Sequence, residues 1–285
     1  MRKNGLLEKT LTGILMLGAL ISGGCNSTHD NKEVRQKEDP VRTENINPKR
    51  ELSSYGTVVY EKNPEAEKQI YIILQTHRII NNGITYESEF FPEIQRNICR
   101  IGERLIREEG AEVIFPEGVI EGEDHYESFK RIREERRDLR ARIRNAGDEE
   151  LKEMINEGTF GGMAGGYIAV GNDSYIVGPE DERLFRDATR LMSEEKGEEP
   201  SKKFLELSEN RTERIMNNIK RKMSEERGKG RIIRERGMFV YGSEHKKEII
   251  EYAERTSKDY GIKILAPRLI EKVRDGRIVP SKVNE

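Results

Sequence analysis

The chain has 285 residues, of which 36% are charged and 6% aromatic, and it carries a formal net charge of −2 at pH 7. It contains no Trp, so a core must be built mainly from aliphatic side chains. The length suffices for one large domain with flanking segments. Positive and negative residues nearly balance, and no block of like charge indicates a surface for nucleic acid. We therefore expect no nucleic-acid partner.

The first 25 residues predict a targeting segment outside the fold. Arg2 and Lys3 precede a mostly apolar run over 11–21, and the sequence Ser-Gly-Gly-Cys follows at 22–25. This pattern resembles a bacterial-type lipoprotein signal, in which Cys25 would carry the lipid. We expect a lipid-anchored protein on the extracytoplasmic face of the cell membrane. The alternative is an uncleaved N-terminal anchor.

Residues 26–54 are polar and nearly free of large apolar side chains, which is typical of a disordered tether. A single domain is then expected over 55–285. Its apolar runs predict strands at 57–60, 69–74, 112–115, 174–177, 238–241 and 263–265, and helical patterns cover 90–109, 182–192, 202–226 and the residues after 245.

Strands that alternate with helices predict an α/β fold, with a largely parallel central sheet flanked by helices. A polar loop is expected after His77. The highly charged residues 126–146 predict a helical insertion with a thin apolar stripe, either a solvated helix or a lid.

A histidine or an acid follows four of the predicted strands. These residues are His77, Glu117, Glu180 and His245. Parallel strands end at one edge of a sheet, and binding sites form in the crevice there. Two imidazoles and one or two carboxylates suit a divalent transition metal that keeps positions open for water. Alternatively, the carboxylates follow buried strands only for turn or capping reasons.

His245 is expected in the first turn of a helix. Gly242 permits a tight turn after the strand, and Ser243 is a favourable N-cap residue. The helix dipole at this end disfavours the imidazolium and keeps a nitrogen lone pair available. These features suit a metal ligand or a general base, and the alternative is a histidine that faces solvent.

Arg211 is expected to point inwards from the long helix over 202–226. It lies four residues after Leu207 and four before Ile215, within the apolar stripe of that helix. A buried guanidinium needs an anionic partner, because an unpaired buried charge is very costly.

The order of these motifs resembles the Tiki/TraB superfamily, which includes erythromycin-esterase-like and ChaN-like haem-uptake proteins. The similarity covers about Tyr55 to Pro267, and its best parts are Gly242-Ser243-Glu244-His245 and the segment from Asn210-Arg211 to Met216. The first motif departs from the family, because Leu74 stands where a glycine is expected.

This resemblance implies a metal-dependent hydrolase that acts on a peptide or ester bond, in a peptide or small-molecule substrate. His77, Glu117 and His245 would hold a divalent transition metal (Mn, Fe or Zn), and the metal would lower the pKa of bound water towards ~7.

The remaining family positions imply roles in proton transfer and charge stabilisation. Glu180 or Glu244 would take the proton of the water, and Arg211 would stabilise the developing oxyanion. The anionic partner of Arg211 would be Glu117, Glu180 or the substrate itself.

Two alternatives stay open. One is a ChaN-like lipoprotein that binds haem or another ligand without catalysis, for which Tyr86, His125 and Tyr126 are available. The other is a protein that retains the fold but has no chemistry, in which Arg211 and the carboxylates satisfy one another.

Overall fold

The structure is a computed structural model. It describes residues 55–75, 79–81, 84–86, 91–121, 147, 168, 174–194, 201–256 and 259–270. The predicted signal segment, tether and charged insertion therefore lie outside the described residues, as do Cys25 and His77.

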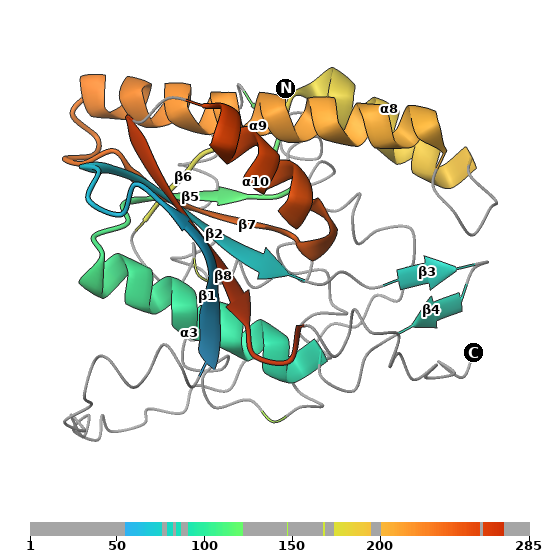
Figure 1. The fold of residues 1–285 in the computed structure, drawn as a ribbon, viewed down its shortest axis with the longest axis horizontal. Helices are drawn as coiled ribbons and strands as arrows, with labels where there is room; N and C mark the ends of the chain where they lie inside the picture. The colour runs from blue at the N-terminus through green and yellow to red at the C-terminus, as the bar shows by residue number, and fades with distance from the viewer. Residues whose placement is uncertain are drawn as a thin grey trace, which may run out of the picture.

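Six strands form one mixed sheet in the order β1-β8-β2-β7-β5-β6 (Figure 1). The strands are β1 (Gly56–Lys62), β2 (Lys68–Gln75), β5 (Val113–Pro116), β6 (Tyr175–Ile176), β7 (Arg236–Gly242) and β8 (Tyr260–Pro267). β1 pairs antiparallel with β8, and the other four pairs are parallel. The prediction of an α/β fold with a largely parallel sheet is confirmed.

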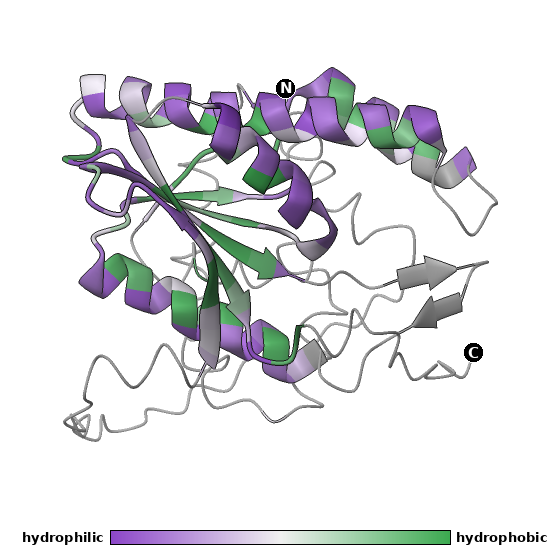
Figure 2. Cartoon of the chain, viewed as in Figure 1, coloured by the Kyte–Doolittle hydropathy of each residue, from purple (hydrophilic) through white to green (hydrophobic). Residues whose placement is uncertain are grey.

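Helices flank the sheet on both faces. α3 (Phe91–Glu108) lies on one face, whereas α9 (Lys202–Gly228) and α10 (Lys246–Arg255) lie on the other, with α8 (Glu182–Glu194) packed along α9 (Figure 1). Apolar residues concentrate on the strands and along one side of α3 (Figure 2). Because burial of apolar surface dominates folding, this pattern fixes which face of each helix meets the sheet.

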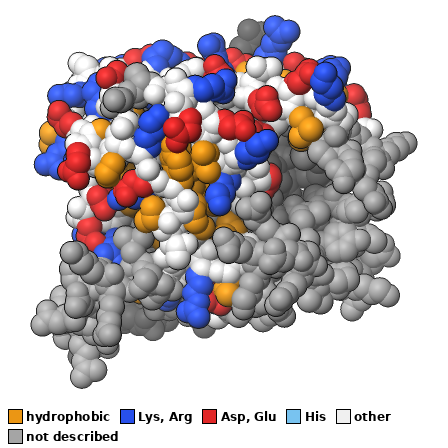
Figure 3. Space-filling model, in the orientation of Figure 1, with side chains coloured by type: hydrophobic (Ala, Val, Ile, Leu, Met, Phe, Trp, Pro, Cys, Tyr) orange, Lys and Arg blue, Asp and Glu red, His pale blue; other side chains and the backbone are white. Residues whose placement is uncertain are grey.

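The central strand β2 shows how the sequence builds this core. All its residues after Lys68 are buried, as expected for a parallel strand covered on both faces. Ile70 and Ile72 belong to one apolar cluster with Ile215 and Ile219 of α9. Figure 3 shows hydrophobic side chains near the middle of the face in view, with positive and negative side chains interspersed around them.

The segment after β2 differs from the predicted polar loop. β3 (Ile79–Asn81) and β4 (Ile84–Tyr86) form an antiparallel pair of their own. The Asn82-Gly83 pair between them is a combination favoured in two-residue hairpin turns. The expectation of a loop was wrong, because β3 and β4 are paired strands. The Asn-Gly pair and the flanking isoleucines were the sequence signal for such a strand pair.

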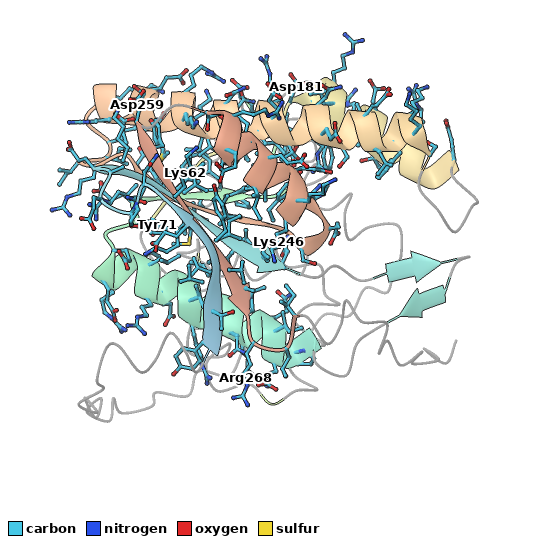
Figure 4. The ribbon with its side chains drawn as sticks, in the orientation of Figure 1. Lys62, Tyr71, Asp181, Lys246, Asp259 and Arg268 are labelled. Atoms are coloured by element: carbon cyan, nitrogen blue, oxygen red, sulfur yellow. The ribbon has the colours of Figure 1, made fainter. Side chains whose placement is uncertain are left out.

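The strand order brings four strand ends to one edge of the sheet. β2, β7, β5 and β6 are consecutive neighbours, and their registers align Gln75 with Gly242 and Pro116 with Val240. Figure 4 marks this edge by Lys246, near the tip of β2, and the opposite edge by Asp259. The residues that follow these strands therefore share one end of the sheet.

Candidate functional site

A buried arginine bound to two carboxylates lies at this edge. Arg211 Nε donates to Glu180 Oε2 at 3.0 Å and Nη2 donates to Glu180 Oε1 at 2.5 Å, which makes the pair bidentate. Nη2 also contacts Glu117 Oε1 at 3.5 Å. Glu180 is fully buried and Arg211 is 9% exposed. The prediction that Arg211 points inwards and meets Glu117 or Glu180 is confirmed.

The surroundings of Arg211 keep its guanidinium charged and in place. Burial by itself would lower its pKa, but the interactions with Glu180, Tyr241 and Glu117 together outweigh burial and raise the pKa above the ordinary arginine value. Phe185 of α8 and Tyr241 of β7 lie beside the guanidinium, with ring centroids 5.4 and 5.7 Å from Cζ. Cation–π contacts of this kind add to the ion pair.

Glu117 ties together the ends of three strands. It follows β5, and its Oε2 accepts hydrogen bonds from Gln75 Nε2 at 3.0 Å and from the backbone N–H of Gly242 at 3.1 Å. Gln75 ends β2 and Gly242 ends β7. These donors, with Arg211, favour the ionised carboxylate and fix its position at the edge.

Glu180 is fixed by backbone contacts as well as by Arg211. Gly118 N–H donates to its Oε1 at 3.2 Å, and its backbone forms an isolated parallel bridge with Ile120. Gly178 permits this approach, because a Cβ at that position would lie 2.1 Å from the Ile120 carbonyl oxygen. The segment before Glu180 therefore requires a residue without a side chain at 178.

The start of α10 differs from the predicted capping. β7 ends at Gly242, and a 3₁₀ turn over Ser243–His245 precedes the helix. His245 is the N-cap residue of α10, without a side-chain capping bond, and Ser243 Oγ donates to Glu244 Oε2 at 3.2 Å. The prediction of Ser243 as the N-cap was wrong, because the 3₁₀ turn moves the helix start further along the chain.

The His245 ring is held by three side chains. Its Nδ1 lies 2.9 Å from Glu248 Oε2 and 3.2 Å from Ser208 Oγ. The ring stacks on Tyr241 with a centroid separation of 4.3 Å and an interplanar angle of 13°. The side chain is 12% exposed. The alternative of a histidine that faces solvent does not hold.

Glu248 is the centre of a second polar cluster next to the arginine. Its Oε1 accepts from Ser208 Oγ at 2.8 Å, and its Oε2 accepts from Thr212 Oγ1 at 2.5 Å and contacts His245. Burial raises the pKa of Glu248, but the hydrogen bonds from His245, Thr212 and Ser208 outweigh burial and hold the pKa below its ordinary value. Glu248 is therefore ionised at neutral pH.

Sequence reasoning missed this second cluster. Ser208 and Thr212 lie three residues before and one after Arg211, on the same inward face of α9. Glu248 lies three residues after His245. The spacing of these polar residues around Arg211 and His245 was the signal that could have identified them.

The other expected site residues have different positions. Glu244 is exposed beside His245. His77, His125 and Tyr126 lie outside the described residues, and Tyr86 lies in β4. Within the described ranges, which exclude His77, no group of three or more His, Cys, Asp or Glu residues is arranged to hold a metal. No helix in the same ranges is long and apolar enough to span a membrane.

Comparisons of the chain with protein-family models, with curated proteins and with solved structures find no match. The fold and the site define an α/β protein with a buried arginine–carboxylate centre and a fixed histidine at the carboxyl edge of a parallel sheet.

Proposed function

We propose that this chain is a membrane-tethered, metal-dependent hydrolase of the Tiki/TraB kind, acting on a peptide or ester bond. The observation that carries this proposal is the way His245 is held. Glu248 and Ser208 both contact Nδ1, so Nε2 is the nitrogen that would bind a metal. Metal-binding histidines commonly engage a carboxylate through their other ring nitrogen, as His245 does here.

The charges of the site also suit a cation. Glu117 and Glu180 supply two carboxylates against one guanidinium, that of Arg211, and Glu248 adds a third carboxylate beside His245. A divalent transition metal accepts both imidazole nitrogen and carboxylate oxygen. Glu117 and His245 follow adjacent strands, and His77 comes two residues after Gln75, which pairs with Gly242. We assign His77, Glu117 and His245 as the ligands.

The contacts of the remaining residues support a different role in the reaction for each of them. A bound metal would supply a hydroxide at neutral pH by lowering the pKa of its water. Glu180 binds Arg211 through both oxygens, which suits positioning better than proton transfer. We therefore assign proton acceptance to the exposed Glu244. Nε and Nη2 of Arg211 are engaged, so Nη1 would donate to a developing oxyanion.

Metal content of the purified full-length protein tests this proposal. We expect a colourless protein that contains Mn, Fe or Zn, measured by elemental analysis and absorption spectroscopy. His245→Ala should weaken metal binding by more than the roughly 10–100-fold that loss of an outer-shell partner typically costs. Lys247→Ala is the control, because Lys247 lies on α10 with its side chain 87% exposed.

Two results would contradict the hydrolase proposal. One is a wild-type protein that binds none of these metals in titrations. The other is a haem Soret band that disappears in His245→Ala, which would support the ChaN-like alternative.

A further inference from the structure

Glu248 is not one of the ligands assigned above, yet it forms the closest hydrogen-bond contact of His245. Three side chains converge on this one carboxylate: the hydroxyls of Ser208 and Thr212 on α9 donate to it, and His245 Nδ1 at the start of α10 lies within hydrogen-bond distance. Thr212 Oγ1 also lies 3.2 Å from the hydroxyl of Tyr241, whose ring stacks on His245. The carboxylate, the hydroxyls and the two rings thus form one connected network.

The positions of the hydrogens in this network follow from its acceptors. A carboxylate oxygen lies 2.9 Å from His245 Nδ1, so a lone pair on that nitrogen would face a negative oxygen. A hydrogen on Nδ1 instead gives a charge-assisted hydrogen bond. Ser208 donates to Glu248 Oε1, so its oxygen remains able to accept from the same Nδ1–H. Both contacts favour the Nδ1–H tautomer.

We propose that Glu248 is a positioning residue that holds His245 as the Nδ1–H tautomer and so directs the lone pair of Nε2 towards the metal. The second half of this inference rests on the proposed function, whereas the tautomer itself does not. In a neutral imidazole one nitrogen donates and the other accepts, so fixing the hydrogen on Nδ1 prepares Nε2 for a ligand.

Nitrogen-15 spectroscopy of the full-length protein with labelled histidines tests the tautomer directly. The chain contains four histidines, and comparison with His245→Gln identifies the signals of His245. At a pH of about 8.5, well above the ordinary histidine pKa of about 6.5, the shifts show which nitrogen carries the hydrogen. We expect Nδ1–H in the wild type.

Variants of Glu248 then test its role. In Glu248→Gln the amide can donate as well as accept, so the Nε2–H form should gain population and zinc affinity should fall roughly 10–100-fold. Glu248→Asp should restore the Nδ1–H form at least in part. Glu251→Gln removes a carboxylate from the half-exposed side of α10 and should change neither quantity.

The outcomes separate this inference from the proposed function. A wild-type Nε2–H tautomer, or an unchanged Nδ1–H population in Glu248→Gln, would overturn the role of Glu248. The expected tautomers without zinc binding to the wild type would uphold that role and refute the metal site. If Glu248→Gln does not fold, Ser208→Ala takes its place as the test. This variant keeps Glu248, so His245 should keep its hydrogen on Nδ1. Loss of the Nδ1–H tautomer in Ser208→Ala would overturn the inference.

Discussion

Replacement of Arg211 by Met is expected to lower the free energy of unfolding by about 3–5 kcal/mol, the usual cost of removing one partner of a buried ion pair. Glu180 is fully buried and the side chain of Glu117 is 8% exposed, so neither carboxylate can regain water as a substitute partner. Chemical denaturation of the wild type and Arg211→Met measures the difference. Metal content of the same samples shows whether the metal site is lost when the ion pair is removed.

Arg214→Met is the matched control for this substitution. Arg214 lies on the same helix, but its side chain is 57% exposed and its Nε is 3.6 Å from Asp181 Oδ2. Loss of such a surface pair should change the free energy of unfolding by less than about 1 kcal/mol. Equal stabilities of Arg211→Met and the wild type would mean that Arg211 faces solvent in the protein. That result would also weaken the resemblance to Tiki/TraB proteins.

Replacement of Cys25 by Ser is expected to move the protein from the membrane fraction to the soluble fraction. The lipid would be attached to the Cys25 thiol, which serine lacks, so the variant would lose its anchor. Cell fractionation followed by a salt wash measures the distribution. Cys99→Ser is the control, because Cys99 lies in α3, where burial raises the thiol pKa to about 12 and makes it unreactive.

Retention of Cys25→Ser in the membrane fraction after the salt wash would contradict the lipid anchor. The segment over 11–21 would then act as an uncleaved anchor. Release of both cysteine variants would instead show that fractionation follows folding and not lipidation.

The sequence was sufficient to predict the features that depend on the spacing of apolar residues and on the order of the elements along the chain. Buried parallel strands are continuous apolar runs, so the core of β2 could be identified before its partners were known. The inward direction of Arg211 followed from its spacing to Leu207 and Ile215 on one helix face. Its partner Glu180 was one of the three anions that the resemblance to Tiki/TraB proteins implied, with Glu117 and the substrate.

Tertiary contacts between polar residues could not be predicted in the same way. Ser208 and Glu248 are 40 residues apart and meet only because α9 packs against α10. Polar residues on helices usually face solvent, so their types alone do not indicate a buried cluster. The 3₁₀ turn over Ser243–His245 could not be predicted either. A serine after a glycine indicates that a helix begins nearby, but it does not show whether a 3₁₀ turn comes first.

The most direct test of the central claim is a crystal structure of the zinc-loaded protein with anomalous scattering at the zinc edge. The proposal predicts one zinc ion about 2.0–2.1 Å from His245 Nε2, with His77 and a Glu117 oxygen as further ligands. Imidazoles of His77 and His245 more than ~10 Å apart would contradict a shared metal site, since each ligand must lie about 2 Å from the ion.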